Sequence, residues 1–160
     1  MSEPAVPPVP PRGVAPGTAP VEAPNPLPAR APEITAETEP FWRATAQGRF
    51  LLLRCDTCRT VIWYPRSFCP DCGGRATSWE EAAGTGTVYS FTITRRGLGP
   101  WREVGPYVMA YVELDEGPRM LTNIVDCPVE DVRVGQRVTV VFHDTGAGAA
   151  LPRFRPVADS

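Results

Sequence analysis

Regularly spaced apolar residues predict β-structure throughout the second half of the chain. Segments rich in β-branched and aromatic side chains alternate there with glycine, proline and acidic turn residues. We expect strands at five places: residues 86–95, 107–114, 119–125, 137–143 and 153–157. No convincing long helix interrupts them, and a compact connector follows the third strand at residues 128–135. Five strands with such a connector are typical of a small OB-fold barrel, so the predicted fold class is mainly β.

The second predicted strand is informative because its alternation separates two faces of the barrel wall. Consecutive side chains on a strand point to opposite sides. One face carries the set that would fill the barrel interior: Val108, Ala110, Val112 and Leu114. The other face carries three large side chains: Tyr107, Met109 and Tyr111. These three are candidates for contact with a partner or a ligand, and packing within the chain is the alternative.

A short N-terminal helix is predicted before the cysteine-rich region. Thr38 can serve as its N-cap, Pro40 is tolerated in the first turn, and Gly48 would stop it. Phe41 and Trp42 are adjacent, so they cannot both occupy the centre of one narrow apolar stripe. We therefore expect packing against the ribbon, with contact of one of them to something outside the domain as the alternative.

Four cysteines form two Cys-x-x-Cys pairs with ten residues between the pairs: Cys55, Cys58, Cys69 and Cys72. They follow a predicted strand at residues 49–54, and their spacing fits one tetrahedral zinc ion (Zn²⁺) held by two knuckles. Cysteine fills every ligand position and leaves none for water, so the expected zinc is structural. An iron site of the rubredoxin type has the same ligands and stays open. The fifth cysteine, Cys127, and the apparent absence of a secretory segment argue against a disulfide framework.

The turns after the two cysteine pairs differ at the residue that follows the second cysteine. Gly73 follows Cys72, whereas Arg59 follows Cys58. Glycine enters the left-handed backbone conformation readily, and a residue with a side chain does so at a cost. We therefore expect the first turn to form without an easy left-handed position.

Residues 1–33 hold more than half of the chain's 20 prolines and few large apolar side chains. Residues 6–11, Val-Pro-Pro-Val-Pro-Pro, favour the extended polyproline II conformation. We expect a disordered tether here, with a Pro-x-x-Pro docking site as the alternative. Because neither a signal peptide nor a membrane-spanning stretch is recognised, a cytoplasmic location is expected. The expected parts are a tether at 1–33, a helix at 34–48, a zinc ribbon at 49–78 and an OB fold at 79–158.

Charge and the lack of a catalytic pattern weaken two classes of function. The formal net charge is −2, and all 16 basic residues are arginines. Since phosphate neutralisation supplies most non-specific affinity for nucleic acid, such a binder is only the alternative, in which Trp101, Tyr107 and Tyr111 would stack on single-stranded bases. The single histidine, His143, is expected to be a surface or capping residue, and no acid–base pair stands out. We therefore do not expect the chain to be an enzyme by itself.

The order of these parts resembles a known family. The resemblance rests on Phe41-Trp42, Gly48-Arg49-Phe50-Leu51, Tyr64-Pro65-Arg66 between the knuckles, Trp79, the run from Gly84 to Thr92, and Val134-Gly135 with Val138. Over about residues 38–157 the chain is similar to the acyl-CoA-associated family that joins a rubredoxin-like zinc ribbon to an OB fold, domain of unknown function thirty-five. This implies a non-catalytic partner of thiolase-superfamily enzymes, among them thiolases and hydroxymethylglutaryl-CoA synthase, that helps to complete the acyl-CoA channel.

Some members of that family follow a hot-dog-fold hydratase domain through a flexible linker, which the Pro-rich start resembles. The preferred special case implied by the resemblance is a partner of the thiolase-like retro-aldolase of steroid side-chain degradation. Four arginines are candidates for contacts to the phosphates of a shared acyl-CoA: Arg66, Arg95, Arg96 and Arg102. The candidate contacts to the partner enzyme are Phe41, Trp42, Trp101, Tyr107, Met109 and Tyr111.

Overall fold

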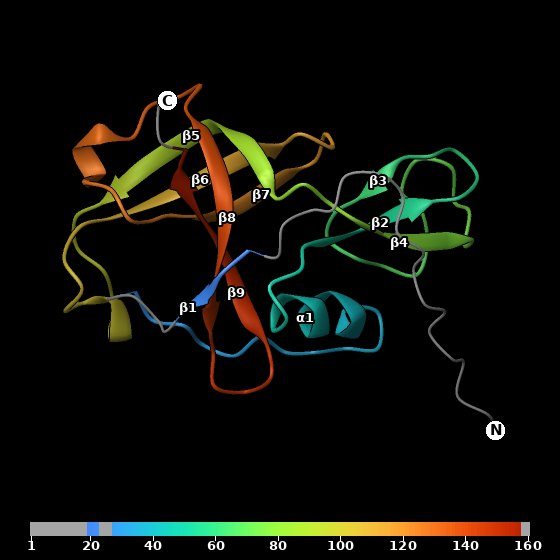
Figure 1. The fold of residues 1–160 in the computed structure, drawn as a ribbon, viewed down its shortest axis with the longest axis horizontal. Helices are drawn as coiled ribbons and strands as arrows, with labels where there is room; N and C mark the ends of the chain where they lie inside the picture. Colours follow the sequence, from blue (N-terminus) through green and yellow to red (C-terminus); the bar gives the residue numbers. More distant parts are fainter. Residues whose placement is uncertain (1–18, 23–26, 158–160) are drawn as a thin grey trace.

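The computed structural model describes residues 19–22 and 27–157. The barrel strands are β5 (Thr85–Thr94), β6 (Tyr107–Leu114), β7 (Arg119–Ile124), β8 (Arg137–Asp144) and β9 (Ala150–Pro156). The ribbon strands are β2 (Leu51–Cys55), β3 (Val61–Ile62) and β4 (Thr77–Glu81). The remaining elements are β1 (Val21–Glu22), helix α1 (Glu39–Thr45) and two 3₁₀ turns, η1 (Gly99–Trp101) and η2 (Val129–Asp131). Figure 1 shows the barrel on one side of the molecule, the ribbon on the other, and α1 below and between them.

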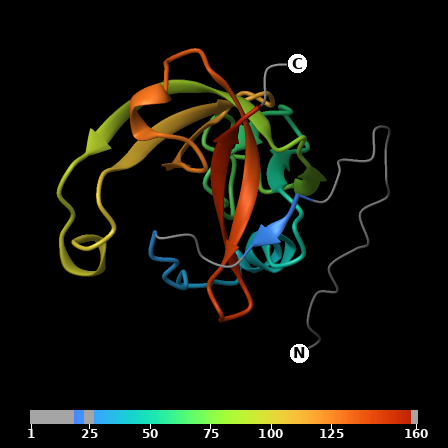
Figure 2. The ribbon, with the colours of Figure 1, turned by 60° about the vertical axis from the view of Figure 1, so that its left-hand side comes forward.

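The five long strands close into a barrel in the order β5-β6-β7-β9-β8, with β8 pairing again to β5. Two views show the curled sheet from different sides (Figures 1 and 2). Neighbouring strands are antiparallel except β7 and β9, which are parallel and join at the single register pair Ile124 and Phe154. The turn η2 lies in the connector after the third strand, as predicted. The OB fold is therefore confirmed, and β7 and β9 diverge to either side of their one junction.

Alternation along β6 gives the barrel its interior, as the sequence pattern predicts. The inward side chains are at most 2% exposed: Val108, Ala110, Val112 and Leu114. Phe142 of β8 and Phe154 of β9 fill the same core and are fully buried. Burial of each valine, leucine and phenylalanine side chain supplies about 1.5–3 kcal/mol. The same core continues to Phe50 and Leu52 at the start of the ribbon, so the barrel and the ribbon share it.

The ribbon is a three-stranded antiparallel sheet in the order β3-β2-β4. Strand β4 pairs with β2 along its whole length, so the expected boundary between residues 78 and 79 falls inside β4. The chain passes from ribbon to barrel at Gly84, whose φ is +71°. A Cβ atom there would lie 2.6 Å from a methyl carbon of Val140, so only glycine fits this close approach.

Helix α1 is fixed at the junction of ribbon and barrel by aromatic packing around Phe41. The ring centroid of Phe41 lies 4.9 Å from Trp42, 5.9 Å from Phe50 and 5.3 Å from Trp63. Phe41 is fully buried, and Trp42 is 8% exposed and donates its indole N–H to the Tyr64 hydroxyl at 2.8 Å. Phe41 is therefore not a surface contact for a partner, because side chains of the ribbon enclose it.

The N-terminal segment is bound to the barrel where the structure describes it. Strand β1 pairs in parallel with β8, and Phe142 donates its backbone N–H to Pro20 at 3.1 Å. Leu27 is buried, and Arg153 donates to the carbonyls of Leu27 and Pro28. The expected disordered tether is thus wrong for these residues, and residues 1–18 and 23–26 lie outside the described part. Within the described residues, no helix is long and apolar enough to cross a membrane.

Candidate metal centre and partner surface

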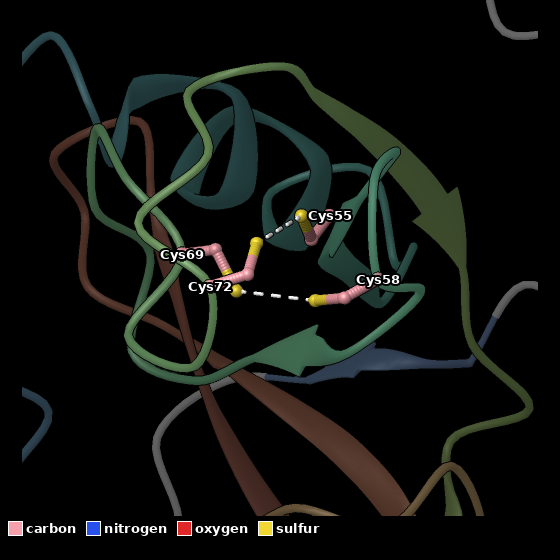
Figure 3. Close-up of side chains that lie close together, drawn as sticks. All are labelled: Cys55, Cys58, Cys69 and Cys72. Atoms are coloured by element: carbon pink, nitrogen blue, oxygen red, sulfur yellow. Dashed lines mark hydrogen bonds between the residues drawn. The ribbon is translucent and has the colours of Figure 1, made fainter.

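The sulfur atoms of Cys55, Cys58, Cys69 and Cys72 form one compact cluster, all within 4.8 Å of one another. Figure 3 shows the two knuckles facing each other, with Cys55 directed toward Cys72 and Cys58 toward Cys69, at 3.6 and 3.5 Å. A tetrahedral zinc ion with sulfur ligands at about 2.3 Å sets its ligands about 3.8 Å apart. The cluster fits that geometry, and its four thiolates would leave no position for water. Bound zinc would hold the two knuckles together.

The two knuckles have the same backbone hydrogen bonds, which explains why the ribbon is nearly symmetric. Arg59 N–H donates to Cys55 O at 3.0 Å, and Gly73 N–H donates to Cys69 O at 2.9 Å. Arg59 has a φ of +66°, close to the +73° of Gly73. The first turn thus adopts the left-handed conformation without the glycine that makes it easy. The Arg59 carbonyl accepts a hydrogen bond from the Arg54 guanidinium at 2.7 Å, and the Arg59 side chain pairs with Glu80 at 3.0 Å.

Polar residues around the sulfur cluster link the two knuckles. The hydroxyl of Thr60 lies 3.3 Å from Cys58 Sγ and donates to Asp71 at 2.8 Å, across the gap between the pairs. Hydrogen bonding with Thr60, through its side chain and then its backbone, lowers the pKa of the Cys58 thiol to about 6. The Gly74 N–H lowers the pKa of the Cys72 thiol, but hydrogen bonds with the other three thiols outweigh it and raise that pKa to about 12. A thiolate is the form that binds a metal, so Cys58 reaches the liganding state more readily than Cys72 does.

The four candidate arginines do not gather at one place. Arg95, Arg96 and Arg102 lie on the connection between β5 and β6 and are exposed, whereas Arg66 lies in the ribbon. Figures 1 and 2 show that connection and the ribbon at separate ends of the molecule. Arg95 pairs with Glu130 at 3.0 Å, and Arg66 bonds the carbonyl of Tyr64. A phosphate site can therefore draw on the three loop arginines, and Arg66 is separate from it.

The outward aromatic residues of the barrel fall into two groups. Trp101 is half-buried, and its ring lies 4.7 Å from that of Tyr107, in a cluster that also holds Leu27. Tyr111 is 47% exposed, while Met109 beside it is half-buried. Of the residues expected to contact a partner or bases, Tyr111 is therefore the most open, and the Trp101–Tyr107 pair is packed within the chain.

His143 is buried, contrary to the surface position expected for it. Arg153, 2% exposed, donates to His143 Nδ1 at 2.6 Å, and it also donates to the two carbonyls of the N-terminal segment. Burial lowers the pKa of His143, and the positive charge of Arg153 lowers it further. Burial also lowers the pKa of Arg153 to about 10. His143 is therefore a neutral acceptor that orients Arg153, with no access to a substrate.

The buried state of His143 predicts acid sensitivity. The folded-state pKa is depressed, so the contribution of His143 to stability is complete above the unfolded-chain value of about 6.5 and is lost as pH falls toward the folded value. We expect the free energy of unfolding to fall by at most about 1.4 kcal/mol per pH unit in that range. His143→Gln should reduce this slope. Urea unfolding at pH 7.5 and 5.5, with zinc content checked at both, measures it, and equal slopes would contradict the assignment.

A groove of about 290 Å³ lies where β7 and β9 diverge, and no sequence pattern singled it out. One wall consists of Trp42, Trp63 and Tyr64, and the other consists of residues 120–123 of β7 and 151–153 of β9. We call it the aromatic groove. Its sequence signal is the Trp63-Tyr64 pair, of which only Tyr64 stood out in the sequence, as part of the bridge between the knuckles.

Known families and relatives match the architecture just described. The family model for the ChsH2 rubredoxin-like zinc ribbon domain matches residues 42–78, and that for the ChsH2 C-terminal OB-fold domain matches residues 79–143. A probable enoyl-CoA hydratase alpha subunit of Thermomonospora curvata is 36% identical over 78% of this chain. The chain spans only 39% of that relative's length. The zinc ribbon and the OB fold predicted from the sequence are thus confirmed.

Shorter relatives correspond to the chain over most of their length. A DUF35 domain-containing scaffold protein of Methanocaldococcus jannaschii is 35% identical, with 72% of this chain and 88% of that protein covered. The benzoylsuccinyl-CoA thiolase subunit BbsA of Thauera aromatica is 28% identical, with 67% of this chain and 75% of BbsA covered. The solved structure of an Ltp2-ChsH2(DUF35) aldolase superposes with a TM-score of 0.72 at 35% identity, covering 80% of this chain and 100% of that chain. The chain therefore belongs to the DUF35 family.

Proposed function

We propose that this chain is a non-catalytic accessory subunit that binds a thiolase-superfamily enzyme and helps to form its acyl-CoA channel. The observation that carries the proposal is the similarity to the DUF35 chain of an aldolase over that chain's whole length. The relative BbsA is named as a thiolase subunit, which supports an enzyme partner of the same superfamily. The preferred special case is the retro-aldolase of steroid side-chain degradation. The long relative named as a hydratase subunit supports an associated or fused hydratase.

The outer face of β6 and β7 suits contact with such an enzyme. Tyr111 and Leu121 are direct cross-strand neighbours, 47% and 52% exposed. Tyr89 of β5 is 48% exposed, and the Arg119 guanidinium lies 3.5 Å from its ring centroid. Exposed tyrosine and arginine are common anchors of protein interfaces. We define these four residues as the outer patch and propose it as the enzyme contact.

The connection between β5 and β6 supplies groups for a shared acyl-CoA. Arg96 and Arg102 are exposed there, and Arg95 is engaged only in a surface ion pair with Glu130. An exposed ion pair contributes about 0–1 kcal/mol, so a phosphate group can displace it easily. Arginine forks match phosphate oxygens, which makes these three residues the proposed contacts to the nucleotide end of CoA.

The proposed enzyme contact predicts a loss of binding on Tyr111→Asp. A charge placed in the outer patch would have to be buried unpaired, so we expect the affinity for the enzyme to fall about tenfold or more. The chain is co-expressed with thiolase-superfamily enzymes encoded in the same genome, and complexes are measured by size-exclusion chromatography with light scattering. Acyl-CoA cleavage is then assayed with steroid and non-steroid substrates.

Val134→Asp is the matched control, because Val134 is an exposed apolar residue outside the outer patch, in the connector before β8. It should leave the complex intact. A chain that stays monomeric and changes the activity of no thiolase-superfamily enzyme would refute the proposed function. If a complex forms and Tyr111→Asp does not weaken it, the proposed function stands, but the outer patch is not the enzyme contact. Cleavage of only non-steroid substrates would remove the steroid special case.

A further inference from the structure

We propose that the aromatic groove binds residues 6–11 of the same chain, Val-Pro-Pro-Val-Pro-Pro, in the polyproline II conformation. These residues lie outside the described part of the chain, and they include two overlapping Pro-x-x-Pro sequences. The inference does not depend on the enzyme partner. It rests on the aromatic wall of the groove, on the open backbone edge of β7, and on the place where the described chain begins.

The aromatic wall is built to hold flat rings and to donate a hydrogen bond. Trp42 donates its indole N–H to the Tyr64 hydroxyl at 2.8 Å, which leaves the hydroxyl's own proton for an acceptor in the groove. Tyr64 is 38% exposed, and Trp63 lies beside it with its ring nearly perpendicular, at 5.3 Å. Grooves lined by tryptophan and tyrosine bind polyproline II segments by packing proline rings between aromatic side chains.

The second wall offers a backbone donor at Leu121. Leu114 N–H donates to Pro118 O at 2.9 Å, so these two residues form a hydrogen-bonded pair at the turn between β6 and β7. Along an antiparallel ladder, every second pair of facing residues is hydrogen-bonded. Met120 and Thr122 therefore direct their N–H and C=O groups to β6. Leu121, between them, directs its N–H and C=O groups away from β6, and it lines the groove.

Within residues 19–22 and 27–157, no strand forms a backbone ladder with this edge of β7 beside Leu121. The neighbour on that side is β9, whose register with β7 is the single pair Ile124 and Phe154. Val125 N–H donates to Phe154 O at 2.8 Å, and nearer to Leu121 the strands are joined through the Thr122 side chain, whose hydroxyl donates to Pro152 O at 3.0 Å. An open strand edge binds extended segments through its backbone groups. The groove thus combines an unpaired backbone edge with an aromatic wall.

The polar groups of the groove suit a proline-rich segment that keeps an N–H group. Tyr64 O–H and Leu121 N–H are donors, for which such a segment offers carbonyl acceptors, and the N–H of Val9 is a donor for the Leu121 carbonyl. The one charged side chain of the lining, Arg153, already donates to Leu27, Pro28 and His143.

The described chain begins close enough for its own N-terminal segment to reach the groove. Ala19 donates its N–H to Gly48 O at 2.9 Å, just after α1. Trp42 lies six residues before Gly48, about 9 Å along a helix. The eight steps from residue 11 to residue 19 span up to about 25 Å in polyproline II. A short tether also gives the segment a local concentration of about millimolar, so weak intrinsic affinity is enough.

Amide hydrogen exchange on the full, zinc-loaded chain tests the inference. The wild type is compared with a variant that combines Pro7→Ser, Pro8→Ser, Pro10→Ser and Pro11→Ser. We expect the Leu121 amide to exchange about tenfold or more faster in the variant, because its acceptor is lost. The Thr122 amide, which bonds β6, should be unchanged. A control with Pro4→Ser and Pro16→Ser, outside the segment, should behave as the wild type.

A groove variant completes the design. Tyr64→Phe keeps the ring and removes only the hydroxyl, so it should speed exchange at Leu121 in the wild-type chain and have no further effect in the four-proline variant. Equal exchange at Leu121 in the wild type and the four-proline variant would overturn the proposal. If protection of the Leu121 amide rises with protein concentration, a second copy of the chain occupies the groove. If that protection appears only when an enzyme is added, the enzyme occupies it. Either result also overturns binding of the chain's own segment.

Discussion

A chain with Cys69→Ser is expected to lose its zinc and, with it, the folded ribbon. Cys69 is fully buried, and the ribbon's own core is small, formed by Leu53, Cys55, Ile62 and Cys69 with Trp79 packed against it. Structural zinc supplies about 10–16 kcal/mol to comparable small domains, far more than so small a core. Most of the larger core cluster comes from the barrel strands, so the barrel should stay folded. Zinc per chain by mass spectrometry of metals, with amide exchange at Ile62 and Val112, measures both effects.

Cys127→Ser is the matched control for that result. Cys127 lies outside the sulfur cluster and packs against the barrel core, where burial raises the pKa of its thiol. The variant should bind stoichiometric zinc like the wild type. Full zinc content and a protected Ile62 amide in Cys69→Ser would contradict the structural role. A coloured protein that contains iron in place of zinc would favour the rubredoxin-type site.

The metal centre and the barrel were predictable because their signals are local. Two Cys-x-x-Cys pairs fix four sulfur ligands through turns of a few residues, and the alternation from Val108 to Leu114 fixes which face of β6 is buried. The conformation of Arg59 was not predictable, because intrinsic preference disfavours a positive φ for arginine. The Arg59 carbonyl accepts a hydrogen bond from Arg54, a contact that only the folded ribbon provides.

The N-terminal segment was mispredicted because its partners are distant in sequence. Its prolines and few large apolar residues resemble a disordered tether, yet the carbonyls of Leu27 and Pro28 meet Arg153 more than 120 residues later. The same contact buries His143, which a lone histidine at a strand end does not suggest. Hydrogen bonds to backbone carbonyls leave no compositional signal, so neither position could be inferred from residue types alone.

The candidate surface was predicted only in part, because a sequence shows which residues are apolar but not which element covers them. Tyr111 is open, as one of the two interpretations of β6 required, whereas Tyr107 packs on Trp101. The aromatic groove combines α1, the ribbon and the edge of β7, so it exists only in the assembled fold. Arg66 lies in the ribbon and Arg95 lies in the barrel. Their positions in the sequence do not show that these two parts place them at different sites.

Phe41→Ala is expected to destabilise the chain by about 3–5 kcal/mol, the range for removal of a buried phenylalanine ring. The ring contacts side chains from three parts of the molecule, with Trp42 on its own helix, Phe50 before β2 and Trp63 in the ribbon. Its removal leaves a cavity where α1, the ribbon and the barrel meet, and relaxation into that cavity is limited by the barrel core. Urea unfolding followed by tryptophan fluorescence measures the change in the free energy of unfolding.

Phe68→Ala provides a control with the same chemical change at an exposed position. Phe68 is 46% exposed in the ribbon, so its truncation should change the free energy of unfolding by less than about 0.5 kcal/mol. The comparison separates burial from side-chain type. If Phe41→Ala retained wild-type stability and only weakened binding to an enzyme partner, Phe41 would have to be a surface contact, and the packing of α1 described above would be wrong. A large loss of stability for Phe41→Ala alone would establish α1 as the part of the core that joins the zinc ribbon to the barrel.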